Sequence, residues 1–346
     1  MEKNGEIVVS KKQLIKNIEE IKKIARNKKI CAMVKANAYG HGLENVVEKL
    51  RNSVDFFGVA NINEALKIRE ICPNAKILIV GKTQFFKDCW KNNLSFVIES
   101  FSQFENLMLQ VKNNENYDCI NIHIKINSGM NRLGISSVKE FKKIFEECEK
   151  NNINVEGILT HFSTADCDEK FFEKQKIVFK RFLKEIPKRE QPIIHIGGSA
   201  AAISKMDFDF DMVRIGIGLY GYLKGANVKP VMQVKSHLIK VFDVEAGDRI
   251  GYSNGFIAKE NMKIGIVPLG YGDGISRNLS NKAEVAINKT KCKIVGHICM
   301  DMFFVDVSRA QAKEGDEVVV FKDAKKWAQI LGTTSYEVLT SFSLIR

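Results

Sequence analysis

The chain has 346 residues, of which 45% are hydrophobic and 27% are charged, which is the composition of an ordinary globular protein. No apolar run approaches the length that spans a bilayer, so the composition argues against a membrane protein. The formal net charge of +12 is spread over every predicted helix and forms no single basic tract, which argues against nucleic-acid binding as the main function.

The cysteines and the first residues indicate a reducing compartment. Eight cysteines lie far apart without a Cys-x-x-Cys pair, and this spacing favours neither a zinc site nor a disulfide framework. The first residues carry charges and then only a short apolar run, which does not resemble a signal peptide. We therefore expect a cytoplasmic protein without a metal site.

The predicted elements begin with a strand at Ile7–Val9. Ser10 follows it and is a favourable capping residue for a helix. We expect residues 1–9 to pack with the C-terminal part of the chain. The apolar residues of the helix fall on one face at helical spacing and are Leu14, Ile18, Ile21 and Ile24.

Eight apolar runs then alternate with stretches of helical period. This alternation predicts an α/β fold, a closed parallel (β/α)8 TIM barrel over residues 10–225, with its site at the carboxyl ends of the strands. A doubly wound open sheet shows the same alternation but would gather its site residues at one switch point. The runs are Ile30–Val34, Phe56–Ala60, Ile77–Val80, Phe96–Ile98, Ile120–Ile126, Val155–Leu159, Pro192–Ile196 and Met212–Ile215.

The alternation ends at the loop Lys224–Pro230. Beyond it, short β-rich runs are separated by glycine-containing turns, which predicts a mostly β domain over residues 226–346. The runs are Val231–Val244, Lys263–Val267, Ala283–Ile287, Met302–Val307 and Glu317–Phe321.

The segment Val34–Gly42 places Lys35 where the first apolar run ends. A lysine whose stem lies among apolar residues has a lowered pKa, and its neutral amine can form a Schiff base with an aldehyde such as pyridoxal phosphate. A lysine at a strand end can also simply extend its amine into solvent. The remaining segments have to decide between these interpretations.

The segment closely resembles the cofactor-binding segment of the alanine racemases, pyridoxal phosphate enzymes that interconvert L- and D-alanine. The resemblance extends over nearly the whole chain, because further motifs recur in the order of that family. These motifs are Lys125–Gly134, Leu159–Ser163, Gly197–Ser199, Val213–Ile217, Pro268–Gly274, Cys299–Asp301 and Ser335–Val338.

In the barrel, the resemblance implies that Lys35 binds the cofactor and that the hydroxyl of Tyr39 contacts its phosphate. Arg132 matches an arginine that bonds the cofactor's phenolic oxygen and the substrate carboxylate, for which a guanidinium fork is suited. Lys125 matches a lysine that is carbamylated in some relatives, where the anion orients the arginine. Asn127–Ser128 replaces the usual Asp-Thr, and Lys125 could equally pair with an acid.

The resemblance also implies that His161 lies against the cofactor ring. A histidine at a strand end is otherwise more often a structural hydrogen-bonding residue. Backbone N–H groups and a hydroxyl at a helix start form a suitable phosphate cradle. Gly198 stands where the family more often has asparagine. The expected cradle residues are Ser199, Gly216 and Ile217.

Arg214 matches the arginine that faces the pyridine nitrogen of the cofactor. A guanidinium stays protonated and can only donate to an unprotonated nitrogen. The ring is then a weaker electron sink than one paired with a carboxylate, which favours proton exchange over transamination or decarboxylation. Ile215 replaces the family's usual proline without removing a functional group.

Inversion of a chiral centre requires two bases on opposite faces of a planar intermediate, and Lys35 can be only one of them. Tyr271 matches the second base of the family. The backbone of Met300 is implied near the substrate carboxylate, Asp301 at the substrate entrance and Tyr336 on the phosphate. In the family, Tyr271, Met300 and Asp301 come from the partner subunit, which implies a head-to-tail homodimer.

The sequence therefore predicts a cytoplasmic alanine racemase that supplies D-alanine for peptidoglycan, the bacterial cell-wall polymer. Three alternatives stay open. One is a racemase of the same architecture that acts on serine, lysine or several amino acids. A second is a barrel decarboxylase, which would be expected to have a carboxylate at the position of Arg214. The third is a non-catalytic pyridoxal phosphate carrier, which would resemble the first domain alone.

Overall fold

The structure is a computed structural model that describes residues 4–26, 28–113, 119–204, 206 and 208–342. Its chain forms two compact units. The first, called the barrel unit, contains Leu14–Lys35 and Leu43–Lys229. The second, called the β unit, contains the chain up to Gln13, residues 36–42 and the chain from Pro230 onward.

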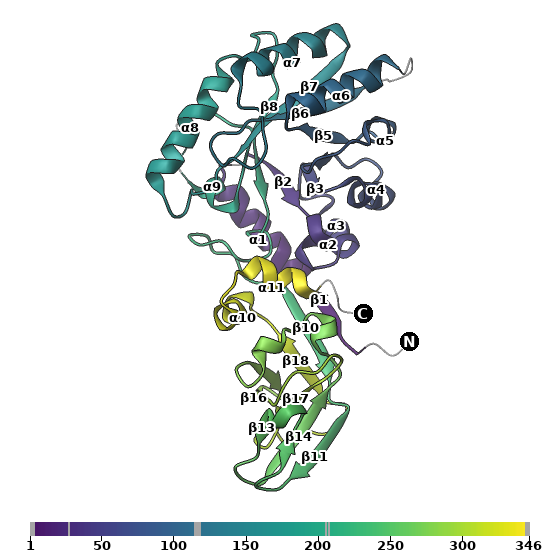
Figure 1. The fold of residues 1–346 in the computed structure, drawn as a ribbon, viewed down its shortest axis with the longest axis vertical. Coiled ribbons are helices and arrows are strands. Elements are labelled where there is room, and N and C mark those ends of the chain that lie inside the picture. Colours follow the sequence, from purple (N-terminus) through teal and green to yellow (C-terminus); the bar gives the residue numbers. More distant parts are fainter. Residues whose placement is uncertain (1–3, 27, 114–118, 205, 207, 343–346) are drawn as a thin grey trace. The chain divides into compact units, whose positions relative to one another are not determined.

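The barrel unit is built on eight parallel strands, β2 to β9, that close into a barrel (Figure 1). The barrel closes through β2 and β9, where Ile30 pairs with Val213. Each predicted run coincides with one strand, which confirms the predicted barrel. The strands are β2 (Lys29–Met33), β3 (Phe56–Val59), β4 (Ile77–Ile79), β5 (Ser95–Ile98), β6 (Ile120–Lys125), β7 (Ile153–His161), β8 (Ile193–Gly197) and β9 (Met212–Ile215).

Helices alternate with these strands, and several of them begin at a side chain that caps the helix. Asn61 Oδ1 accepts the N–H of Glu64 at 3.0 Å, and Asp168 Oδ1 accepts the N–H of Phe171 at 3.0 Å. Apolar residues on one face of each helix pack on the barrel. The helices are α1 (Lys11–Ile24), α3 (Leu43–Leu50), α4 (Ile62–Ile71), α5 (Phe86–Lys91), α6 (Phe101–Lys112), α7 (Val138–Lys150), α8 (Glu169–Leu183) and α9 (Ser199–Ile203).

The inside of the barrel is not entirely apolar. Ile122, Ile124 and Ile196 are fully buried, as expected for strands covered on both faces. Buried polar groups lie on the same strands, among them His123 on β6 and His195 on β8. Buried polar side chains need hydrogen-bond partners, so these groups must satisfy one another.

The β unit is built on one eight-stranded sheet in the order β1, β10, β18, β15, β16, β17, β14, β11. The mostly β character that the sequence predicts is confirmed. Its strands are β1 (Glu6–Val9), β10 (Met232–His237), β11 (Lys240–Val244), β14 (Met262–Val267), β15 (Glu284–Ile287), β16 (Thr290–Val295), β17 (Phe303–Asp306) and β18 (Glu317–Phe321), and β12 (Arg249–Ile250) pairs separately with β13 (Phe256–Ile257).

The predicted run Val231–Val244 is two strands, β10 and β11. The N–H of Leu238 donates to Asp316 and that of Ile239 donates to Ile266, so the chain leaves one part of the sheet and enters another between these residues. Local apolar character cannot predict this change of partner. β1 pairs antiparallel with β10, with Ile7 opposite Val234.

Short helices complete the β unit. Asp323 Oδ1 caps α10 (Ala324–Leu331) through the N–H of Lys325 at 3.0 Å. The rings of Phe321 and Phe342 lie 4.5 Å apart and pack α11 (Ser335–Ser341) and its C-terminal end against β18. The other short elements are α2 (Lys35–Tyr39), η1 (Tyr252–Asn254), η2 (Tyr271–Asp273) and η3 (Arg277–Leu279). None of the helices in the described residues is long and apolar enough to cross a membrane.

The structure divides the chain differently from the predicted boundary between residues 225 and 226. The division lies after Lys229, and residues 36–42, which the sequence analysis placed in the barrel domain, belong to the β unit. The reason is close packing at Gly40, where an added Cβ would lie 2.1 Å from the carbonyl oxygen of Leu339 on α11.

Candidate active site

Lys35 follows β2 by two residues, at the carboxyl ends of the barrel strands, where barrel enzymes place their sites. Its side chain is partly buried. Burial, followed by the charge of Arg132, lowers the pKa of the Lys35 amine, while Glu64 acts in the opposite direction. The amine therefore loses its proton more readily than a surface lysine does.

The residues after Lys35 form a left-handed turn. Ala36, Asn37, Ala38 and Tyr39 all have φ between 52° and 54°, although none of them is glycine. Such a conformation costs about 1–2 kcal/mol for each residue with a side chain, so surrounding contacts must hold it. One such contact is made by the buried His41, whose Nδ1 lies 2.9 Å from the carbonyl oxygen of Tyr39.

Four cationic side chains surround His161 at the end of β7. Burial, followed by the charges of four neighbours, lowers the pKa of His161 to about 3. His161 is therefore a neutral imidazole at physiological pH. The four neighbours are Arg214, Arg132, Lys125 and Lys35. The structure therefore brings together the charged barrel residues that the motifs singled out.

Arg214 on β9 is buried and fixed by hydrogen bonds. Its Nη2 donates to the carbonyl oxygen of Thr160 at 2.7 Å, and its Nη1 donates to Nδ1 of His195 at 3.0 Å. Burial lowers the pKa of the guanidinium to about 10, so it still carries its charge at neutral pH. The space beside it exists because residue 197 is glycine, since a Cβ there would lie 2.1 Å from Nη2.

Lys125 at the end of β6 has a carboxylate neighbour that the motifs did not reveal. The pKa of Lys125 is lowered to about 8, chiefly by burial; Glu99 acts against this shift, and Arg132 contributes to it. Glu99 is 3% exposed, and its Oε2 has no hydrogen-bond partner among the described residues. An acid that follows a short buried strand, here β5, is the only sequence signal that could have identified it.

Ser199 begins α9 and packs against the turn that follows β9. Its Oγ accepts the N–H of Gly218 at 3.1 Å, and the side chain is buried. The structure therefore places Ser199 beside the turn that contains Gly216 and Ile217. Gly198 precedes the helix with φ of +105°, a conformation that side chains rarely adopt.

The β unit holds the other predicted residues in two groups. The rings of Tyr39 and Tyr336 lie 6.0 Å apart. Burial, followed by the nearby Tyr336, raises the pKa of the Tyr39 phenol, which therefore stays protonated. An oxygen that stays protonated can donate a hydrogen bond to an anion such as a phosphate.

The second group surrounds Tyr271 in η2. The N–H of Tyr271 donates to Cys299 at 3.0 Å, and the N–H of Gly272 donates to Met300 at 2.8 Å. Gly270 allows this approach, because a Cβ there would lie 2.3 Å from the carbonyl oxygen of Met300. The side chains of Tyr271 and Met300 are 43% and 61% exposed, and Asp301 is also exposed.

The two groups of the β unit lie on neighbouring elements. Gly274, directly after η2, has φ of +90°, and a Cβ there would lie 2.2 Å from the carbonyl oxygen of Ser341. Ser341 ends α11, the helix that begins with Ser335 and carries Tyr336. The turn of Tyr271 therefore packs against the helix of Tyr336.

Comparison with known proteins identifies the family. The model of the alanine racemase N-terminal domain matches residues 9–224, and that of the alanine racemase C-terminal domain matches residues 231–344. The chain belongs to the alanine racemase family. This confirms the resemblance that the motifs indicated, and members of the family are pyridoxal-phosphate-dependent racemases.

Relatives in the alanine racemase family match almost the full length of the chain. The alanine racemase of Vesicomyosocius okutanii is 33% identical and covers 97% of this chain and 96% of its own length. Alanine racemase 1 of Oceanobacillus iheyensis is 35% identical, with 92% of this chain and 88% of that protein covered.

Solved structures of alanine racemases have the same fold. That of Clostridium difficile 630 has a TM-score of 0.91 at 31% identity and covers 98% of this chain and 93% of that chain. That of Bartonella henselae, described with covalently bound pyridoxal phosphate, has a TM-score of 0.85 at 27% identity and covers 98% and 97%.

The donor set of the barrel unit fits the cofactor of the alanine racemase family. Lys35 offers an amine of lowered pKa, which suits an aldehyde. Arg214 offers fixed N–H donors, which suit a ring nitrogen. Ser199 offers a hydroxyl beside a glycine turn, which suits a phosphate.

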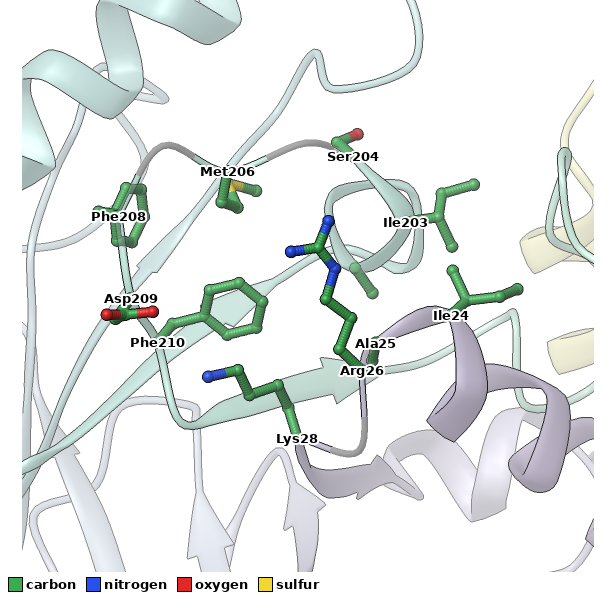
Figure 2. A pocket seen from close by; sticks show the side chains of 11 residues that line it. Ile24, Ala25, Arg26, Lys28, Ile203, Ser204, Met206, Phe208, Asp209 and Phe210 are labelled. Atoms are coloured by element: carbon green, nitrogen blue, oxygen red, sulfur yellow. The ribbon is translucent and has the colours of Figure 1, made fainter.

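A separate pocket of about 480 Å³ lies at the other end of the barrel strands and is not the alanine racemase site (Figure 2). Lys28 precedes β2 and Phe210 precedes β9, so their pocket lies at the amino ends of these strands. Lys28 Nζ lies 5.3 Å from the centre of the Phe210 ring. None of the predicted site residues lines this pocket.

Proposed function

We propose that this chain interconverts L-alanine and D-alanine with pyridoxal phosphate bound through Lys35. The observation that carries the proposal is the state of Arg214, a buried guanidinium that keeps its charge at neutral pH. When bound, the cofactor supplies an electron-withdrawing ring that makes the α-proton of an attached amino acid acidic. A donor such as Arg214 limits that withdrawal and favours proton exchange over decarboxylation.

Lys35 is the proposed base on one face of the substrate. Its lowered pKa increases the neutral fraction of the amine, and only a neutral amine can take up a proton. Arg132 is the proposed partner of the substrate carboxylate, because a guanidinium binds both oxygens. His161 is neutral, so it can lie against a cationic or neutral ring without charge repulsion.

Five residues are proposed to bind the phosphate. Ser199 offers its hydroxyl, and Gly216 and Ile217 offer backbone N–H groups. Tyr39 and Tyr336 are proposed to donate through their hydroxyls, which the close packing of their rings supports. Together these donors would hold the cofactor without a metal ion.

Tyr271 is the proposed base on the opposite face. Its backbone is fixed by the turn at Cys299, while its side chain is 43% exposed and can reach a reaction partner. As a base it must act through the phenolate anion, which a nearby positive charge would stabilise. We propose that Arg214, acting through His161, supplies that charge.

We further propose that Tyr271, Met300 and Asp301 act on the site of a partner subunit in a head-to-tail homodimer. The exposure of Tyr271 and Met300 supports this arrangement, since large exposed side chains are available to a second copy. A cytoplasmic location and the supply of D-alanine for the cell wall remain predictions that follow from membership of the family.

Carbamylation of Lys125 remains a prediction. Carbon dioxide adds to neutral amines, and the pKa of about 8 for Lys125 increases the neutral fraction. Glu99 already supplies a carboxylate beside this lysine and Arg132. A carbamate signal in ¹³C NMR of protein equilibrated with labelled bicarbonate, lost in Lys125→Ala, would support the modification.

The direct test is chiral analysis of the product formed by the purified protein from L-alanine. Lys35→Ala should lose both racemisation and the visible absorbance of lysine-bound cofactor. Lys29→Ala is the matched control, because Lys29 is exposed at the other end of the same strand. A Lys35→Ala protein that keeps both colour and activity would refute the assignment.

Three further measurements on the purified protein distinguish the alternative functions. A rate comparison over L-serine, L-lysine and L-alanine decides whether the enzyme has broader specificity. Release of carbon dioxide from an amino acid would identify a decarboxylase. Bound cofactor without exchange of the α-proton in deuterated water would identify a carrier protein.

A further inference from the structure

A chain of hydrogen bonds runs from Arg214 through the inside of the barrel to Glu156. Arg214 Nη1 lies 3.0 Å from Nδ1 of His195. Nε2 of His195 lies 2.8 Å from Nδ1 of His123, and Nε2 of His123 lies 3.0 Å from Oε2 of Glu156. The hydroxyl of Ser95 also donates to this carboxylate. All of these residues belong to the barrel unit.

Arg214 and Glu156, at the two ends of this hydrogen-bonded chain, determine which atoms donate and which accept. A guanidinium can only donate, so Nδ1 of His195 must be an acceptor and its proton must lie on Nε2. That proton points at Nδ1 of His123, which must therefore also accept. Nε2 of His123 then donates to Glu156, whose carboxylate can only accept when ionised. One tautomer of each ring satisfies every bond.

Burial holds both rings in the neutral state that this direction requires. His123 and His195 are fully buried, and burial is the largest cause that lowers the pKa of each imidazole. Burial is the largest single influence and raises the pKa of Glu156, whereas its neighbours, including the hydrogen-bond donors His123 and Ser95, together lower it, and the net shift is downward. A cation and an anion are thus joined by two oriented neutral rings.

Two glycines make room for the chain. A Cβ on Gly157 would lie 2.2 Å from Nδ1 of His123, and a Cβ on Gly197 would lie 2.1 Å from Nη2 of Arg214. His123 and Arg214 therefore pack directly against backbone positions that carry no side chain.

We propose that Glu156 is a positioning residue for Arg214, acting through His123 and His195 in fixed tautomers. It lies near the amino end of β7, whereas His161 lies at the carboxyl end of the same strand. The inference rests on the proposed function only in that Arg214 faces the cofactor. By fixing the acceptor on His195, Glu156 sets where the guanidinium donates and keeps its other N–H groups available.

Removal of the Glu156 carboxylate should reverse the direction of these hydrogen bonds. In Glu156→Leu, Nε2–H of His123 would be buried without an acceptor, which is unfavourable by about 1–3 kcal/mol. The other tautomer of His123 directs Nδ1–H at Nε2–H of His195, so His195 must change as well. Its new Nδ1–H would then oppose Nη1 of Arg214 and displace the guanidinium. In Glu156→Gln the amide oxygen still accepts, so the tautomers should be kept.

The test is ¹⁵N NMR of the full-length protein labelled only in its six histidines, with and without pyridoxal phosphate. In the wild type, Nδ1 of His123 and His195 should resonate as unprotonated and Nε2 as protonated. His41 is an internal reference with the opposite tautomer, because its Nδ1 faces carbonyl oxygens. Glu156→Leu should move His195 Nδ1 into the protonated range, and Glu156→Gln should not.

Activity provides the second readout. Glu156→Leu should lower kcat for L-alanine by about tenfold, by analogy with residues that hydrogen-bond to metal ligands in other enzymes, while Glu156→Gln retains most of it. Protonated Nδ1 on His195 in the wild type would overturn the proposal, as would equal spectra of the two variants. The NMR result on the cofactor-free protein does not depend on the racemase assignment, so the two can fail separately.

Discussion

Gly197 and Arg214 are packed so closely that residue 197 cannot carry a side chain without displacing the guanidinium. An added Cβ would lie 2.1 Å from Nη2 of Arg214 and 2.7 Å from Nδ1 of His161. Real Cβ contacts of this length do not occur, so one of the two charged or polar side chains must move. The proposed ring-binding residues thus depend on a glycine of β8.

Gly197→Ala should therefore reduce kcat/KM for L-alanine by ~10²-fold, because displacement of a catalytic group by about 1 Å has effects of this size. Gly315→Ala is the control, since its φ of +86° makes alanine strained there but no atom lies within 4 Å. The control should lose a little thermal stability and keep its activity. Wild-type activity in Gly197→Ala would show that Arg214 need not stay in place.

Sharing of the site between subunits can be tested by mixing two inactive variants. Lys35→Ala and Tyr271→Phe should each lower racemisation by ~10²–10⁴-fold, because each removes one proton-transfer group. After unfolding and refolding as an equal mixture, heterodimers would have one intact site if Tyr271 acts on the partner. Recovery of about a quarter of wild-type activity is expected.

The control for the mixing experiment is Tyr252→Phe, which removes the hydroxyl of another exposed tyrosine of the β unit. It should be active alone and unchanged by mixing. If the mixture of Lys35→Ala and Tyr271→Phe stays inactive although heterodimers form, both bases act within one chain.

Gly270→Ala should disrupt the turn that presents Tyr271. The added Cβ would lie 2.3 Å from the carbonyl oxygen of Met300 and 2.4 Å from that of Cys299, and backbone atoms cannot move aside as a flexible side chain can. We expect a loss of about 1–3 kcal/mol in the free energy of unfolding, together with a loss of racemisation. Gly247→Ala, with no atom within 4 Å, should retain activity. Urea unfolding and the racemase assay measure the two effects.

Acid should destabilise the protein through its buried histidines. Burial lowers the pKa of His41 to about 4 from an ordinary value of 6.5, so between these pH values the unfolded chain binds a proton that the folded chain does not. Stability therefore falls as pH falls through this window. The contribution of His41 between pH 7 and pH 5 is about 2 kcal/mol.

His41→Asn tests this contribution, because asparagine keeps an N–H donor for the carbonyl oxygens of Ala38 and Tyr39 but does not titrate. The free energy of unfolding, measured in urea at pH 7 and pH 5, should change less in the variant than in the wild type. The other buried histidines, including His161, would still give both proteins a downward trend with acid. An identical pH dependence would show that His41 titrates normally.

The sequence by itself determined the barrel, the mostly β domain and the family. Burial on both faces requires continuous apolar runs in parallel strands, so Ile30–Val34 and its seven successors are visible without a structure. The cofactor motifs are short and local, and they predict roles for Lys35 and Arg214 because each chemical role needs a particular side chain at a strand end.

Only the tertiary structure decided the contacts between distant segments. Residues 36–42 join the β unit through the packing of Gly40 on Leu339, and the left-handed turn at Ala36 exists only because such packing holds it. In the hydrogen-bonded chain, His123 is 33 residues from Glu156 and 72 residues from His195 in the sequence. The apolar pattern of a strand indicates which of its faces are buried. Which side chains meet across the barrel depends on how the barrel closes and on the register of its strands, and no local sequence pattern determines these.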